Sequence, residues 1–240
     1  MKWNCISILL FFALGCSSQN KDKPKDIEVK EVSETKSTSL LEQQMISSGL
    51  INVQVKEPGI LVELKYSSTD NFLNTDVYGE LENAYLQPDV LIKLQKAYQY
   101  LIDKDSSLTF IIYDATRPVS VQQKMWDIVQ NNYPEKSKYV SNPKNGSLHN
   151  YGAAVDITVA TKNGVALDMG TAYDFFGAAA EPQLENSLLA NGTLTEKQIQ
   201  NRKILREVMV KAGFVQLPSE WWHYNSCSRE QAKVLYKILE

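Results

Sequence analysis

Residues 108–129, LTFIIYDATRPVSVQQKMWDIV, decide the expected fold. The first six residues of this stretch are a continuous apolar run rich in β-formers, which predicts a buried strand. Residues 119–129 place apolar side chains at helical spacing, which predicts a helix. Residues 114–118 (DATRP) therefore connect a strand to a helix.

The flanking sequence adds further strands and helices. Residues 51–57 (INVQVKE) and 60–66 (ILVELKY) alternate as strands do around the turn Pro58-Gly59, and AAVDITV at 153–159 predicts another strand. Further elements are expected as follows: helices opening at Pro88, at the capping box that begins with Thr195 and at Ser228, and short strands at 214–217 and 221–224. No repeating βαβ order appears. The sequence predicts a single α+β domain, a small antiparallel sheet flanked by helices.

The N-terminus predicts export. Met1 and Lys2 precede an apolar run at 6–14 that is too short to span a bilayer, so residues 1–15 are interpreted as a signal peptide. A small residue directly before Cys16 resembles the lipobox of bacterial lipoproteins, in which this cysteine is lipidated. The alternative is an ordinary cleaved signal with an incidental cysteine. Either way, we expect the chain to leave the cytoplasm.

A polar segment follows the signal peptide. From residue 17 to 48 the sequence has no aromatic residue and many charges of both signs, so it buries too little apolar surface to order itself. We therefore expect residues 16–48 to be a lipid-anchored tether, with a short helix at 40–46, and a globular domain over residues 49–240.

Charge and cysteine content limit the possible functions. The formal net charge is −3 and basic residues are scattered, which argues against a nucleic-acid partner. Only Cys227 lies beyond the N-terminal segment, so no internal disulfide is expected there. We interpret Cys227 as a small buried hydrophobic residue.

Both histidines of the chain have acidic neighbours. Asp156 follows His149 by seven residues, and Glu220 precedes His223 by three. A catalytic zinc needs three protein ligands and an open fourth position, and two histidines with Asp156 meet that count. Glu220 is then placed to reach the metal-bound water. Taken separately, a lone histidine is more often structural, and Glu-x-x-His occurs widely by chance.

A family resemblance makes these patterns specific. SLHNYGAAVDIT (147–158) and EWWHY (220–224) resemble the two metal-binding signatures of the M15 metallopeptidases, the D-Ala-D-Ala dipeptidase and carboxypeptidase group. LKYSSTDNFLNTDVYG (64–79), YDATRP (113–118) and LDMGTAYDFF (167–176) resemble the VanX-type dipeptidases. The resemblance implies the M15 peptidase, Hedgehog-like fold.

The resemblance also implies a role for each matching residue. It places one Zn²⁺ per chain on His149, Asp156 and His223, makes Glu220 the general base, and gives Arg117 transition-state stabilisation. It implies substrate contacts from Ser147 to a free carboxylate, from Asp174 to a free ammonium group, and from Tyr139 at the amino end. Arg117 in a surface ion pair and Asp174 as a turn cap are the alternatives. Leu148, Asn150-Tyr151 and Ala115-Thr116 depart from the family pattern, which affects fine specificity.

We therefore expect zinc-dependent hydrolysis of D-Ala-D-Ala, or a closely related small dipeptide, outside the cytoplasmic membrane. The protein would be a periplasmic or outer-membrane-attached lipoprotein of the cell envelope. One alternative is a D,D- or L,D-carboxypeptidase acting on peptidoglycan stem peptides. Another is a non-catalytic, zinc-containing cell-wall binding lipoprotein, against which Glu220 and Arg117 argue because a binder needs no base.

Overall fold

The structure is a computed structural model that describes residues 38–132 and 140–240. The expected signal peptide, Cys16 and Tyr139 lie outside these residues. In the part of the chain that is described, no helix combines the length and apolar character needed to cross a bilayer.

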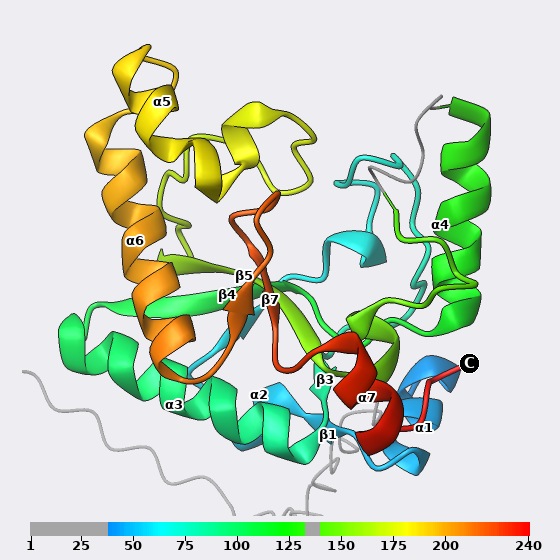
Figure 1. The fold of residues 1–240 in the computed structure, drawn as a ribbon. Coiled ribbons are helices and arrows are strands. Elements are labelled where there is room, and N and C mark those ends of the chain that lie inside the picture. The colour runs from blue at the N-terminus through cyan, green and yellow to red at the C-terminus, as the bar shows by residue number, and fades with distance from the viewer. Residues whose placement is uncertain (1–37, 133–139) are drawn as a thin grey trace, which may run out of the picture. The chain divides into compact units, whose positions relative to one another are not determined.

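The centre of the fold is a five-stranded sheet in the order β2-β4-β5-β7-β6, and a separate pair joins β1 to β3 (Figure 1). All pairs are antiparallel except β2–β4, which is parallel. The strands are β1 Ile51–Asn52, β2 Leu61–Val62, β3 Tyr85–Leu86, β4 Leu108–Asp114, β5 Ala154–Thr161, β6 Val215–Gln216 and β7 His223–Asn225. β4 is buried along its whole length, as its apolar run predicts.

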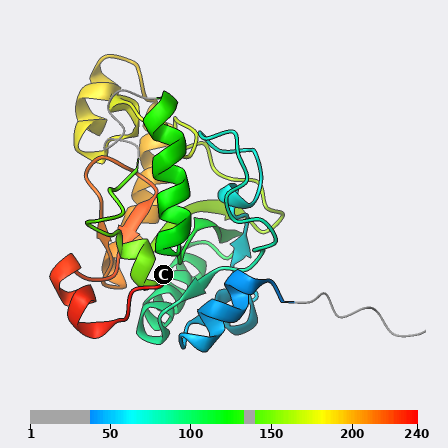
Figure 2. The same ribbon diagram turned by 90° about the vertical axis from the view of Figure 1, so that its right-hand side faces the viewer.

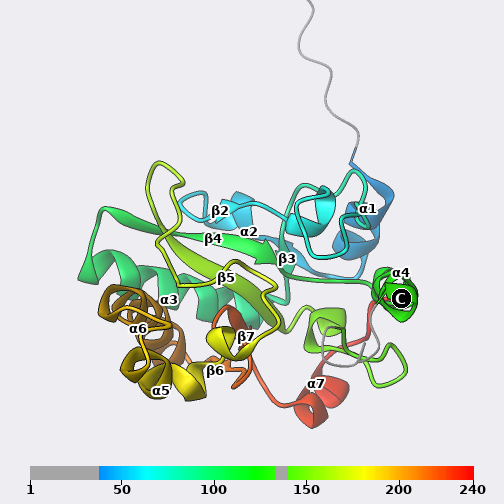
Figure 3. The same ribbon diagram turned by 90° about the horizontal axis from the view of Figure 1, so that it is seen from above.

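Helices flank the sheet. α3 and α6 pack against each other, and α3 contacts β4 while α6 contacts β5; seen from above, α3 runs behind the sheet and α6 stands beside it (Figure 3). The α-helices are α1 Leu40–Ser47, α2 Val53–Lys56, α3 Pro88–Lys104, α4 Val119–Asn132, α5 Glu185–Ala190, α6 Glu196–Lys211 and α7 Arg229–Leu235. The 3₁₀ turns are η1 Lys65–Ser67, η3 Leu148–Tyr151, η4 Ala178–Ala180 and η5 Pro182–Leu184. The α+β prediction is confirmed.

The predicted helix starts are also confirmed. Pro88 is the first residue of α3, and the apolar positions of this helix are buried. Thr195 and Ser228 each form a capping box. The cap side chain accepts from the backbone N–H of a glutamine three residues ahead, and the side chain of that glutamine accepts from the backbone N–H of the cap residue. These local patterns are sufficient because every partner lies within one turn.

The strand predicted at 51–57 is wrong beyond its first two residues. Asn52 ends β1 and accepts a hydrogen bond from the Val55 N–H at 3.1 Å, so it caps the one-turn helix α2. Val55 is 72 % exposed, so the alternating pattern does not produce a buried strand face. A short polar cap therefore overrides the apolar alternation.

The short helix expected at 40–46 is confirmed as α1, but residues 38–48, assigned to the tether by composition, belong to the folded domain. Ser39 caps α1, and Met45 is fully buried in the main core. The C-terminal end holds this region to the rest: Gln44 donates to the Glu240 carbonyl (2.8 Å), and Leu239 pairs with Asn150 and Val119 (Figure 2). Leu41 and Met45, four residues apart, pack on the core from one face of α1, and the buried Glu42 accepts hydrogen bonds from Asn83 and Tyr85.

Candidate active site

The sheet brings the two histidine segments together. Asp156 on β5 lies directly opposite His223 on β7 in the antiparallel register. His149 reaches the same place from η3, which ends at Gly152 with a left-handed φ of 65° just before β5. A side chain at Gly152 would collide with Leu50 and Thr116, at 2.7 and 2.9 Å. The turn into β5 therefore requires this glycine.

His149, Asp156 and His223, here named the metal trio, have the geometry of a tetrahedral metal site. Oδ1 of Asp156 lies 2.9 Å from His223 Nδ1 and 3.4 Å from His149 Nε2, and the two nitrogens are 3.2 Å apart. Ligand–metal distances of about 2.0–2.1 Å in a tetrahedron place ligand atoms roughly 3.3 Å apart. In the described part of the chain, the trio is a candidate group for holding one metal ion.

A second hydrogen bond orients each member of the metal trio. Nδ1 of His149 donates to the Ala115 carbonyl at 2.6 Å, and Nε2 of His223 donates to Asn225 Oδ1 at 2.9 Å. The Tyr173 hydroxyl donates to Asp156 Oδ2 at 2.9 Å. The remaining ligand atoms therefore face one another, as in protein metal sites whose ligands are fixed by outer partners.

The electrostatics of the trio favour a cation. Burial raises the pKa of Asp156, but the adjacent His149 and His223 outweigh burial and hold this pKa well below its usual range. Burial lowers the pKa of His223, yet its hydrogen bond to Asp156 and that carboxylate's charge raise it to about 9. Without a metal, the Asp156 carboxylate is thus paired with a protonated His223, and a divalent metal would displace that proton on binding.

Glu220 lies beside the metal trio. Its Oε2 atom is 3.9 Å from His223 Nδ1, and its side chain remains 24 % exposed toward the pocket. Burial raises the pKa of Glu220, the histidines lower it less, and Asp156 adds to the increase. A carboxylate with a raised pKa is a stronger base, which suits proton transfer beside a metal site.

Arg117 is buried, so the alternative of a surface ion pair is wrong. Its Nε donates to Asp114 Oδ2 at 3.0 Å, its Nη2 binds the same oxygen, and its Nη1 donates to Gln122 at 2.9 Å. Its guanidinium lies 5.1 Å from the centroid of the Tyr66 ring. Arg117 is thus a fixed positive charge at the pocket wall.

The two described residues of the expected substrate contacts lie on separate loops. Ser147 caps η3 by accepting from the His149 N–H at 3.3 Å. Asp174 has a left-handed φ of 57° and accepts a hydrogen bond from the Tyr66 hydroxyl at 2.8 Å. Burial, assisted by the charges of Asp156 and Glu220, raises the pKa of Asp174 well above its usual value. Tyr139 stays a sequence hypothesis.

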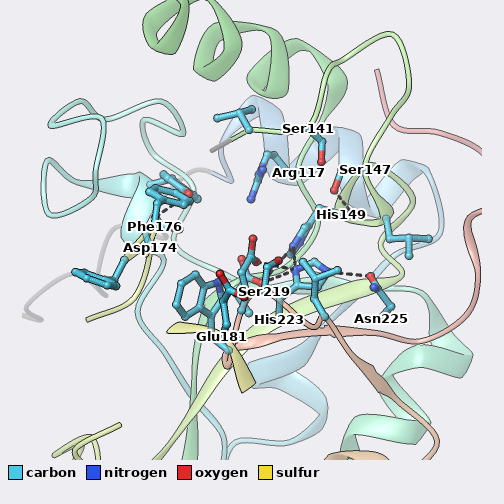
Figure 4. A pocket seen from close by; sticks show the side chains of 18 of the residues that line it. Arg117, Ser141, Ser147, His149, Asp174, Phe176, Glu181, Ser219, His223 and Asn225 are labelled. Atoms are coloured by element: carbon cyan, nitrogen blue, oxygen red, sulfur yellow. Dashed lines mark hydrogen bonds and ion pairs between the residues drawn. The ribbon is translucent and has the colours of Figure 1, made fainter. Parts of the chain in front are cut away.

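One cavity of about 650 Å³ joins these groups. Arg117, His149 and His223 gather around it, and Asp174 stands at one side beside Phe176 (Figure 4). Arg229 and Glu181 add opposite charges to its wall. The cavity can therefore hold a metal ion together with a small ligand that carries charge of both signs.

Sequence reasoning did not identify several partners in this site. They are Tyr66, Asp114, Gln122, Tyr173 and Asn225. Two had a local signal: Asn225 shares a strand face with His223 at a spacing of two, and Asp114 precedes Arg117 by three. Tyr66 is 108 residues from its partner Asp174, and no local pattern connects them.

Comparisons with known proteins agree with this architecture. The M15 peptidase family model, described as D-ala-D-ala dipeptidase, matches residues 46–237. The D-alanyl-D-alanine dipeptidase of Escherichia coli K12 is 31 % identical over 175 residues, which cover 73 % of this chain and 83 % of that protein. The D-alanyl-D-alanine dipeptidase of Synechocystis sp. is 30 % identical over 168 residues, covering 58 % and 68 %.

The solved structure of VanYB in complex with D-alanine-D-alanine aligns with 64 % of this chain and 77 % of that one, at 18 % identity and a TM-score of 0.36. This likeness is too distant to bear on the chemistry. The family model covers the sheet, both histidine segments and the pocket described above. The chain therefore belongs to the M15 peptidase family, and it is a metallopeptidase.

Proposed function

We propose that this protein is a zinc-dependent dipeptidase that hydrolyses D-Ala-D-Ala or a closely related dipeptide. The observation that carries the proposal is the single cavity that combines the metal trio with Glu220, Arg117 and Asp174. The names of the relatives support the choice of substrate, since they are D-alanyl-D-alanine dipeptidases.

His149, Asp156 and His223 would hold the zinc ion. Two imidazoles and one carboxylate at these separations fit its preferred donors. When bound, zinc polarises the scissile carbonyl and acidifies the attacking water.

Glu220 and Arg117 divide the remaining chemistry. Glu220 accepts a proton from the attacking water and then delivers it to the leaving amine. Arg117, fixed by Asp114 and Gln122, stabilises the negative charge that develops on the carbonyl oxygen. Because its guanidinium is already held in place, little reorganisation is needed as the charge appears.

The pocket offers a group for each end of a dipeptide. In this proposal Asp174, which accepts from the Tyr66 hydroxyl, would bind the free ammonium group, and the Ser147 hydroxyl, in the wall of the same cavity, would bind the free carboxylate. A substrate ammonium would compensate the unfavourable burial of the Asp174 carboxylate. An acid that binds a free amino terminus selects a dipeptide over the interior of a longer stem peptide.

The test is alanine release by the purified full-length protein from D-Ala-D-Ala, L-Ala-D-Ala and a pentapeptide ending in D-Ala-D-Ala. We expect release from D-Ala-D-Ala, loss of that release after chelation, and recovery with added zinc. Release from the pentapeptide alone would replace the dipeptidase with a carboxypeptidase. Zinc binding without any release would favour the cell-wall binding alternative.

We also propose that the protein acts in the cell envelope, anchored by lipid on Cys16. The short apolar run ending at Gly15-Cys16 supports this location. Cell fractionation tests it: the wild type should sediment with membranes and Cys16→Ser should not. Equal distribution of the two proteins between membrane and soluble fractions would contradict the proposed lipid anchor on Cys16.

A further inference from the structure

Tyr173 contacts the metal trio, although no step of the proposed reaction uses it. Its hydroxyl donates to Oδ2 of Asp156 at 2.9 Å, while Oδ1 of the same carboxylate faces both histidines. Asp156 is only 3 % exposed, so few other donors can reach Oδ2. The two oxygens of this carboxylate are thus assigned to different partners.

We propose that Tyr173 is a positioning residue that makes Asp156 a one-oxygen ligand of the metal. The proposal rests on the metal site of the proposed function. A free carboxylate can rotate about its Cβ–Cγ bond and offer one or both oxygens to a cation. Since Oδ2 is engaged by a hydroxyl, only Oδ1 is directed at the site, which keeps a coordination position open for water and substrate.

Aromatic packing fixes the direction of the Tyr173 hydroxyl. The ring lies against those of Tyr113, Trp222 and Tyr66, with centroids 5.2, 5.4 and 6.1 Å away. Trp222 directly precedes His223, so this ring contact also joins Tyr173 to the strand that carries one member of the metal trio. A ring enclosed on several sides holds its oxygen in one place at low entropic cost.

The backbone of the Tyr173 loop is fixed as well. Trp221 Nε1 donates to Thr171 Oγ1 at 2.8 Å, and Arg202 donates to the carbonyls of Met169 and Ala179 at 2.6 and 2.8 Å. These bonds hold the loop at both ends, to α6 and to the segment just before β7. Tyr173 is therefore positioned from its ring and from its main chain, as an orienting group must be.

Tyr173→Phe tests the role because it removes the hydroxyl and keeps the packed ring. Tyr113→Phe is the matched control: it comes from the same aromatic cluster, and its hydroxyl is not among the described hydrogen-bond partners of the metal trio. Zinc affinity, measured by competition with a chromophoric chelator, should fall about 10- to 100-fold in Tyr173→Phe and stay within twofold in Tyr113→Phe.

The Co²⁺-loaded proteins give a second readout, independent of turnover. If Asp156 gains a second metal contact in Tyr173→Phe, the visible d–d bands should weaken relative to wild type, because their intensity falls as coordination number rises. Tyr113→Phe should reproduce the wild-type spectrum. Unchanged affinity together with an unchanged spectrum in Tyr173→Phe would overturn the proposal.

These outcomes separate the inference from the proposed function. A wild-type protein that binds zinc without releasing alanine would contradict the dipeptidase and leave the effect of Tyr173 on the metal intact. An active wild type with Tyr173→Phe indistinguishable from it in affinity and spectrum would contradict only the inference. A wild type that binds no zinc would overturn both.

Discussion

The metal side and the substrate side of the pocket are built in different ways. Asp156 and His223 stand on paired strands whose register sets them opposite each other, and His149 stands in the capped turn before one of those strands. Asp174, by contrast, stands in a stretch with no regular element, at a left-handed φ of 57°. Regular elements and a capped turn therefore fix the metal trio, whereas a loop fixes Asp174, the proposed substrate contact.

The two sides also differ in electrostatic cost. At the metal trio, neighbouring charges of opposite sign hold the pKa of Asp156 below its usual range, so the carboxylate is stable even before a metal arrives. On the substrate side, burial raises the pKa of Asp174, so its ionised form is unfavourable until a cation binds. The metal trio thus keeps its carboxylate ionised without a bound cation, whereas a bound cation would favour the ionised form of Asp174.

The largest expected effect comes from removing a ligand. His223→Ala should lower zinc content from one per chain toward zero and abolish turnover, because two remaining ligands hold the ion weakly. His149→Ala should behave in the same way. Metal analysis after dialysis against a mild chelator measures this. Unchanged zinc stoichiometry in either variant would remove that histidine from the ligand set.

Glu220→Gln should separate chemistry from metal binding on the same side of the pocket. The amide keeps the shape of the side chain but accepts no proton, so kcat should fall about 10²- to 10⁴-fold. Zinc content should match the wild type, since Glu220 is outside the trio. Steady-state kinetics on D-Ala-D-Ala with parallel metal analysis gives both quantities. A variant with full activity would require another base.

The same contrast explains what the sequence could predict. Residues 108–113 and 153–159 predict β4 and β5 because long apolar strands have strong local patterns. The register that brings Asp156 to His223 follows from the sheet, whereas the sequence identified both residues as candidates through their types, their spacing and the family resemblance of their segments. Tyr66, which donates to Asp174, had no such signal, because that contact joins two distant loops.

Local reasoning also failed where one polar side chain decides the backbone. At 51–57 the apolar alternation predicts a strand, but the Asn52 cap turns the chain into α2. Composition likewise assigned residues 38–48 to the tether; the short helix expected at 40–46 is present as α1, but Met45 is fully buried in the core and Glu42 accepts from Asn83 and Tyr85, so α1 belongs to the folded domain. Hydrophobic patterns and composition are averaged over several residues, so they do not reveal one capping side chain or one side chain that packs into the core.

Asp174→Asn tests the substrate side, where we expect a smaller loss than at the metal. Replacing a charge-assisted contact to the substrate ammonium by a neutral one should lower kcat/KM roughly 10- to 150-fold, mainly through KM. Zinc content should not change. Glu181→Gln is the matched control, because it removes another acid from the same pocket wall and should cost much less. Equal losses of kcat/KM in the two variants would indicate that the negative charge of the pocket matters as a whole, and not a specific contact from Asp174.

The smallest effect is on stability, and it has the opposite sign. Burial raises the folded-state pKa of Asp174 above its unfolded value of about 4. Between these two pKa values the folded protein binds more protons than the unfolded chain, so the free energy of unfolding falls as the pH rises. Asparagine lacks this titration and tolerates a left-handed φ. Metal-free Asp174→Asn should therefore be more stable than wild type at pH 7, with the gap closing below about pH 4.

Urea unfolding of both metal-free proteins at pH 7 and at about pH 4 measures this difference. A gap confined to pH 7 assigns the cost to the buried carboxylate, which under the proposed function the substrate ammonium would relieve. A gap of equal size at both pH values would assign the effect to the backbone at residue 174. In that case the substrate side would differ from the metal side in conformational strain and not in charge.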